Sequence, residues 1–235
     1  MITLVLGCQS KKVDEQLQEV KTITSSASQL DEKDLGNQIR KVRDGASDSI
    51  RTTYPINSPN LFDELKSLPS LRELVLDGGI VRDEDLFRFI DQVDLTHLRV
   101  RASPLTDDAA KRIAATQKNL KIMNVPQCEF GIAGTSALSE LTSLTHLRLG
   151  GNRIDDSCVA EISKLESLQS LHLIGPKLTG QSLRDISRMK NLQSFYLDDS
   201  RIPDEDWGEF FQARKDIHVH LDQMHHDRDQ SNHSH

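Results

Sequence analysis

The stretch that decides the fold is SLTHLRLGGNRIDDSCVAEISKLE, residues 143–166. Its first half alternates apolar and polar residues, with Arg148 between Leu147 and Leu149, which is typical of a short strand with one buried face. Its second half repeats apolar residues at the spacing of a helix with one buried stripe; these are Val159, Ile162 and Leu165. One stretch of chain therefore predicts a strand followed by a short helix.

The same pattern recurs through most of the chain. Six segments read L-x-x-(apolar)-x-(apolar), and they begin at Leu71, Leu95, Leu120, Leu144, Leu168 and Leu192. The interval between successive starts is nearly constant at about 24 residues, within the range of known solenoid repeats. A fixed period of this length is typical of a solenoid, in which each strand-helix unit buries its apolar face against its neighbours.

An aspartate precedes the helical stripe in four of the six units, twelve positions after the first leucine; these are Asp83, Asp107, Asp156 and Asp204. We expect each to cap the first turn of the helix that follows it. The other two units hold Ile132 and Gly180 at this place. Their substitute caps are expected to be Thr135 or Ser136 in one unit and Thr179 in the other.

Incomplete units flank the six. Before them, Ile50, Phe62, Leu65 and Leu68 fit the template, and Ser58-Pro59 is a plausible start for a helix. After them, Ile217, Val219 and Leu221 predict a last strand. Because the end units of a solenoid are usually atypical, the array is assigned to residues 47–222.

The motif L-x-x-L-x-L-x-x-N-x-I in residues 144–154 resembles the leucine-rich repeat. The resemblance covers about residues 47–222. It implies an α/β fold: a right-handed superhelix with a parallel sheet on the concave side, short helices on the convex side and a period of about 24 residues. In that family an inward asparagine bonds backbone groups between coils. The six units here hold Gly79, Ser103, Cys128, Asn152, Pro176 and Ser200, so we do not expect a continuous asparagine ladder, and we expect Cys128 to be buried.

Residues 1–8, MITLVLGC, resemble the end of a bacterial lipoprotein signal. Val5-Leu6-Gly7-Cys8 matches the box that ends in a lipidated cysteine, whereas a basic leader is missing and the apolar stretch is short. The resemblance implies a lipid on Cys8 and a place in the bacterial cell envelope. The alternative is a small apolar strand or a frayed tail.

Two polar segments flank the array. Residues 9–46 are rich in Lys, Gln, Ser, Asp and Glu, with sparse apolar stripes, and predict a tether that is disordered or forms helices packed on the first coil. Residues 223–235 predict a His-rich disordered tail. Its histidines are metal-binding types, but without a scaffold we assign no metal site. No apolar run is long enough to span a membrane, so any membrane link would be the anchor at Cys8.

Composition and motifs exclude several function classes. A net charge of -7 gives no basic field for nucleic acid. Three scattered cysteines are too few for a disulfide framework or a zinc site. No nucleophile turn, phosphate-binding loop or H-E-x-x-H is present. We therefore expect no enzymatic activity, no catalytic residues and no cofactor.

The candidate binding face is formed by residues that point outward from the predicted strands. They include His97, Arg99, Arg101, His146, Arg148, His172 and Tyr196. Arginine and tyrosine are enriched in binding hot spots; the alternative is that the stripe is only the solvated face of a sheet. We expect a noncatalytic, monomeric protein that binds a protein partner there, as an envelope lipoprotein. The alternatives are a soluble cytoplasmic adaptor and a regulatory or targeting subunit of an enzyme complex.

Overall fold

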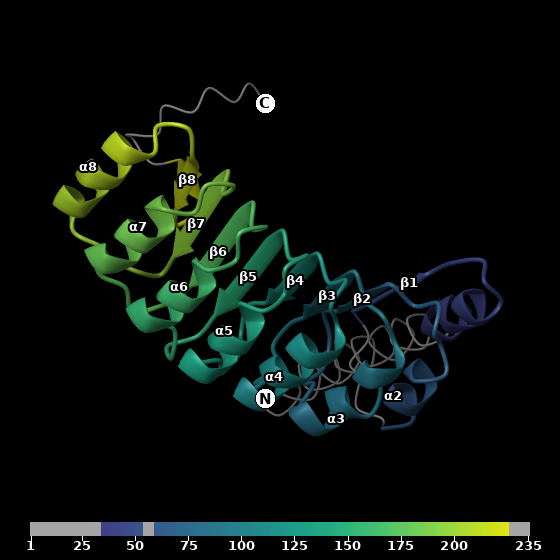
Figure 1. Cartoon of the computed structure of the whole chain (residues 1–235). Helices are drawn as coiled ribbons and strands as arrows, with labels where there is room; N and C mark the ends of the chain where they lie inside the picture. The colour runs from purple at the N-terminus through teal and green to yellow at the C-terminus, as the bar shows by residue number, and fades with distance from the viewer. Residues whose placement is uncertain (1–33, 54–58, 226–235) are drawn as a thin grey trace, which may run out of the picture.

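The computed structural model describes residues 34–53 and 59–225. The lipoprotein-like box with Cys8, most of the expected tether, Ser58 and the last ten residues of the tail lie outside the described residues. Within them, strands and helices alternate along the chain, and the units stack side by side (Figure 1).

One sheet runs through all the described coils, with its strands in sequence order. The parallel strands are β1 (Ser49–Thr52), β2 (Glu73–Leu76), β3 (His97–Val100), β4 (Ile122–Val125), β5 (His146–Gly150), β6 (Ser170–Ile174), β7 (Ser194–Asp198) and β8 (His218–Leu221). A short ninth strand, β9 (Met224–His225), pairs antiparallel with β8. Residues 224 and 225 of the expected disordered tail are therefore ordered in the sheet.

The helices line the opposite side of the solenoid from the sheet (Figure 1). They are α2 (Pro59–Leu65), α3 (Asp83–Phe87), α4 (Asp107–Thr116), α5 (Ile132–Leu138), α6 (Asp156–Ile162), α7 (Gly180–Ser187) and α8 (Asp204–Ala213), with a 3-10 turn, η1, at Ile90–Gln92. Each is short because a single repeat must also hold a strand and two turns. The predicted order of strand and helix within each unit is confirmed.

The repeated leucines fill the space between the sheet and the helices. The first leucine of every unit is at most 1% exposed, and the stripe of Val159, Ile162 and Leu165 is buried with them in one continuous core. The predicted repeat phase is therefore confirmed. Phe62 and Phe89 stack across the first coils, with ring centroids 6.0 Å apart.

The prediction for the four aspartates was wrong by one position. Asp83, Asp107, Asp156 and Asp204 are each the first residue of a helix, and the cap position before them is held by Arg82, Thr106, Asp155 and Pro203. A side chain at the first helical position points away from the amides of its own first turn. Three of these carboxylates instead accept hydrogen bonds from the next coil.

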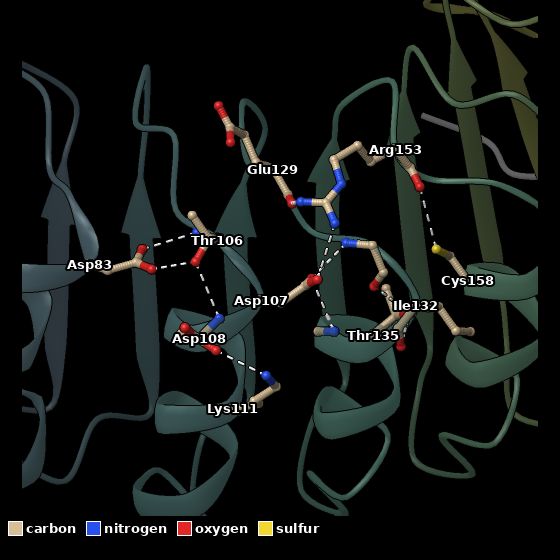
Figure 2. A network of polar contacts seen from close by, with 12 residues as sticks. Asp83, Thr106, Asp107, Asp108, Lys111, Glu129, Ile132, Thr135, Arg153 and Cys158 are labelled. Atoms are coloured by element: carbon tan, nitrogen blue, oxygen red, sulfur yellow. Dashed lines mark hydrogen bonds and ion pairs between the residues drawn. The ribbon is translucent and has the colours of Figure 1, made fainter.

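These inter-coil bonds form a ladder along the starts of the helices (Figure 2). Asp83 accepts from the amide and the hydroxyl of Thr106, the cap of the next helix. Asp107 accepts from the amides of Gly131, at 2.7 Å, and Gly134, at 3.1 Å. Glycine at 134 permits this approach, since a Cβ there would lie 2.6 Å from Asp107 Oδ1. The carboxylate of one coil thus caps the helix of the next.

Of the two predicted substitute caps, one is confirmed and the other is wrong. Thr179 accepts from the amide of Gln181 and is the cap of α7, as predicted. Thr135 and Ser136 do not cap α5, because Thr135 bonds back to the carbonyls of Gly131 and Ile132 within its own helix. Gly131 holds the cap position, and Asp107 of the preceding coil supplies the acceptor.

At the position where the family has an inward asparagine, the described coils form no continuous asparagine ladder, as expected. Ser103 is 2% exposed and bonds the amide of Val81 in the preceding coil. Cys128 is buried and its thiol donates to the carbonyl of Gly150 in the next coil, so it is a filler that also links coils. Asn152, in the unit that matches the family motif best, is exposed and does not take the inward role.

Both edges of the sheet are covered. Residues 34–43 form a helix beside β1, with Leu35, Ile39 and Val42 buried in the common core, so this part of the expected tether packs on the first coil. The amide side chain of Gln38 pairs with both backbone groups of Arg51 on the outer side of β1. At the other end, β9 covers β8.

Candidate concave binding face

The parallel register places the outward side chains of the strands in two straight rows. The central row consists of Arg51, Val75, Arg99, Asn124, Arg148, His172, Tyr196 and His220. The row beside it consists of Ser49, Glu73, His97, Ile122, His146, Ser170, Ser194 and His218. The structure therefore brings six of the seven predicted residues onto one face, and Arg101 follows β3 at its edge.

Ion pairs hold many of these side chains. Arg99 Nε lies 2.7 Å from Asp77 Oδ1, and His97 Nδ1 lies 2.9 Å from Glu73 Oε1. His172 Nε2 lies 2.8 Å from Asp198 Oδ2. The sequence did not predict the pairing of Asp77 and Asp198. These pairs could be identified only from the fold, because each joins residues more than 20 positions apart in the sequence.

Burial and neighbouring charges shift two of the histidines. Burial lowers the pKa of His97, and Arg51 and Arg99 lower it further, whereas Glu73 acts in the opposite direction. Burial likewise lowers the pKa of His172, with Asp198 opposing and Arg148 adding to the decrease. Both rings are therefore mainly neutral at pH 7 and act as hydrogen-bonding surfaces rather than as fixed cations.

Arg148 differs from the paired cations of the face. It lies at the centre of β5, it is partly buried, and among the described residues it has no ion pair. Its Nε is enclosed without a hydrogen-bond partner, as is Oδ1 of its neighbour Asn124 on β4. Burial lowers the pKa of Arg148, and the charges of Arg99 and Arg101 add to this effect while Asp198 opposes it.

Aromatic and imidazole rings form a continuous platform over the last strands. Tyr196 lies 5.4 Å from His172 and 5.1 Å from His220 between ring centroids, and His218 lies 4.6 Å from His220. The face predicted from the sequence did not include His218 and His220. The alternation His218-Val219-His220-Leu221 was the signal that could have found them, because it repeats the strand pattern.

The two remaining candidates are solvent-facing. The side chains of His146 and Arg101 are exposed, and His146 Nδ1 lies 2.9 Å from Thr145 Oγ1 of the same strand start. They border the central row rather than lie within it. The face thus has paired charges toward its N-terminal end, the unpaired Arg148 at its centre and rings at its C-terminal end.

The described residues also include two buried free cysteines, Cys128 and Cys158. Burial raises the pKa of the Cys128 thiol to about 11 and also raises that of Cys158, so neither is an activated nucleophile. Residues 34–53 and 59–225 hold no cluster of three His, Cys, Asp or Glu that could bind a metal ion. No helix in these ranges is both long and apolar enough to cross a bilayer.

The chain is similar to solved leucine-rich repeat structures. No family model matches the chain, and no curated protein matches it in sequence. An internalin (inlF) from Listeria monocytogenes is similar in structure, with 19% identity and a TM-score of 0.53 over 68% of this chain and 43% of the internalin. The leucine-rich repeat ectodomain of the Arabidopsis receptor kinase HAESA, solved with a peptide hormone, has 17% identity and a TM-score of 0.40 over 60% of this chain and 32% of its own. This chain has the fold of a leucine-rich repeat protein.

Proposed function

We propose that this protein is a noncatalytic recognition module that binds a protein partner on the concave face of its sheet. The observation that carries the proposal is the central row, where Arg148, His172 and Tyr196 lie in register on adjacent strands. Adjacent strands are about 4.8 Å apart, so one partner can contact all three side chains at once. Arginine and tyrosine anchors of this kind contribute most of the affinity in protein interfaces.

The rings beside Arg148 support a protein partner. The platform of His172, Tyr196 and His220 is preorganised by ring contacts, so little side-chain freedom remains to be lost on binding. Its rings offer both apolar faces and polar edges, a combination that is typical of protein interfaces.

The test compares the face with the helical side. Partner protein is first isolated by pull-down from an extract, and affinities are then measured by calorimetry for Arg148→Ala and Tyr196→Ala. We expect each to weaken binding by roughly thirtyfold, about 2 kcal/mol. The controls are Lys164→Ala and Lys190→Ala, exposed residues outside the strands. Equal losses in the control variants, with folding intact, would exclude the concave face.

The location of the protein is a separate part of the proposal. We propose an envelope protein anchored through a lipid on Cys8, on the strength of the box Val5-Leu6-Gly7-Cys8. The competing assignments are a soluble cytoplasmic adaptor and a regulatory subunit. Cell fractionation distinguishes the first two, since Cys8→Ser should move an anchored protein into the soluble fraction and leave a cytoplasmic one unchanged. Stable co-purification with an enzyme would favour the third.

A further inference from the structure

The arginines of the concave face pair with carboxylates except at its centre. Arg51 pairs with Glu73 and Arg99 pairs with Asp77, while the mainly neutral rings of His97 and His172 hydrogen-bond Glu73 and Asp198. Among the described residues, two arginines of this region have no such partner: Arg148 and Arg101, which lie near enough to interact electrostatically. The patch of arginines without an ion pair therefore spans β3 to β5, with acidic residues on both sides.

Of the two arginines, Arg148 should destabilise the folded state more. Its side chain is partly buried, its Nε lacks an acceptor, and burial with the charges of Arg99 and Arg101 lowers its pKa more than Asp198 raises it. An enclosed polar atom without a partner normally destabilises a protein, and a desolvated charge without a counter-ion does so more strongly. A sheet needs no arginine at an outward position, so this cost is unexplained by folding alone.

Asn124 adds a second unused group beside the first. It is the register partner of Arg148 on β4, and its enclosed Oδ1 has no donor among the described residues. The pair thus offers donors from a guanidinium and an acceptor from an amide within one strand spacing, about 4.8 Å. An extended acidic residue presents the complement, since its carboxylate accepts and its backbone N–H donates.

We propose that the centre of the concave face binds an extended acidic segment of a partner protein, with a carboxylate on the guanidinium of Arg148 and a neighbouring backbone amide on Asn124. The proposal rests on the proposed function and specifies the chemistry of the partner. A second acidic side chain two residues away along the segment, about 6.8 Å, would lie within reach of Arg101.

The distribution of charge favours a short acidic segment over a long polyanion. The positive patch covers three strands, about 10 Å between the outer two. Beyond it lie the acidic partners Glu73 and Asp77 at one end and Asp198 at the other. The whole chain carries a net charge of -7, so a nucleic acid or sulfated glycan that ran past the patch would be repelled.

The binding test uses synthetic peptides at low salt, where exposed charges are least screened. The probe is a peptide of about eight alternating Glu and Thr residues, roughly 26 Å when extended, and its reference replaces every Glu with Gln. We expect calorimetry to detect the acidic peptide only. Arg148→Gln should weaken its binding about tenfold or more, which corresponds to about 1.4 kcal/mol. The control is Arg188→Gln, the same charge change at a side chain that is 72% exposed at the end of α7.

A second measurement needs no ligand. Replacement of Arg148 by Met keeps most of the side-chain length and removes the uncompensated charge, so we expect the thermal midpoint of the free protein to rise. Arg99→Met removes a paired charge and leaves Asp77 without its partner, so its midpoint should fall. A fall for Arg148→Met would show that the fold uses this arginine, and would overturn the inference.

The remaining outcomes are equally decisive. Equal binding of the Glu and Gln peptides, or unchanged binding by Arg148→Gln, would overturn the acidic-segment inference. Tighter binding of single-stranded DNA or heparin than of the peptide would assign the patch to a polyanion instead. A partner that loses affinity in Tyr196→Ala but not in Arg148→Gln would overturn this inference and leave the proposed concave-face function standing.

Discussion

At the scale of single residues, the acidic side chains at the helix starts act between coils. Asp156 accepts hydrogen bonds from the amide and hydroxyl of Thr179 and from the hydroxyl of Ser182, all in the next coil. Burial alone would raise the pKa of Asp156, but these hydrogen bonds outweigh it and hold the pKa below its ordinary value. The folded state therefore favours the ionised carboxylate.

This shift predicts how stability depends on pH. A lowered pKa stabilises the folded state above the ordinary value near 4, and that contribution disappears as pH falls through the lower, folded value. Asp156→Asn should lose about 1 to 3 kcal/mol at pH 7, because the amide cannot accept all of these bonds. The deficit relative to wild type should shrink below about pH 4. Urea unfolding at several pH values measures it.

The matched control is Asp108→Asn. Asp108 has the same charge and also lies in the first turn of a helix, but its side chain is 72% exposed and its ion pair is with Lys111 of the same helix. We expect little change in stability at any pH. A deficit for Asp156→Asn that stayed constant down to acid pH would contradict the ionised inter-coil bond.

At the scale of elements, two coils are longer than the others by a single position. They run from Leu95 to Leu120 and from Leu192 to Ile217, and their helices, α4 and α8, are longer than those of the other coils. Three positions before the first apolar residue of the next unit, most coils carry Leu or Met, whereas the two long coils carry Gln117 and Arg214. The polar replacements are buried, at 0% and 8% exposure.

These buried polar side chains satisfy backbone groups where the preceding coil joins their own. Gln117 donates to the carbonyls of Ile90 and Val93 and accepts from the amide of Leu95. Arg214 likewise donates to the carbonyls of Met189 and Leu192, at 2.7 and 2.6 Å, and its charge is balanced by Asp216. The longer helix thus displaces the apolar residue, and a polar side chain holds the coils together.

We predict that Gln117→Leu destabilises the array although leucine is the usual residue at this position. The change leaves two carbonyls and one amide enclosed without partners, and each costs about 1 to 3 kcal/mol. The expected result is a clear fall in the thermal midpoint measured by circular dichroism. Gln92→Leu is the control, since Gln92 holds the same repeat position but is exposed. A midpoint equal to wild type for Gln117→Leu would mean that these groups find other partners.

At the scale of the whole molecule, the solenoid is a one-dimensional stack whose ends need protection. The helix at residues 34–43 buries Leu35, Ile39 and Val42 and pairs Gln38 with the open side of β1. An uncovered strand edge is a template for pairing with other chains. This helix is therefore part of the folded array and covers its first edge.

Deletion of residues 1–43 should expose that edge and the core behind it. We expect size-exclusion chromatography to show dimers or larger species, and hydrogen exchange to accelerate first in β1 and α2, because contacts in a solenoid are made mainly with neighbouring units. Deletion of residues 1–32 retains the whole described helix and is the control. A monomeric, fully protected product of the longer deletion would show that the helix is dispensable.

The sequence by itself determined the repeat, its phase and the outward rows of the sheet. The reason is that a fixed period ties each leucine to the core and each intervening residue to the concave surface. The pattern therefore sufficed to name His97, Arg99, His146, Arg148, His172 and Tyr196. It also identified Cys128 as an inward residue, because Cys128 holds the small-residue position.

Only the tertiary structure decided which of these side chains already have hydrogen-bond or ion-pair partners within the chain. Asp107 is separated by 24 positions from Gly131, whose amide it binds, and Arg99 by 22 from Asp77. Such partners depend on the rotation and spacing of successive coils, and a repeat pattern encodes the position of each residue but not the direction of its side chain. For the same reason, the unpaired charge of Arg148 became visible only when the carboxylates of Asp77 and Asp198 proved to bind Arg99 and His172 instead.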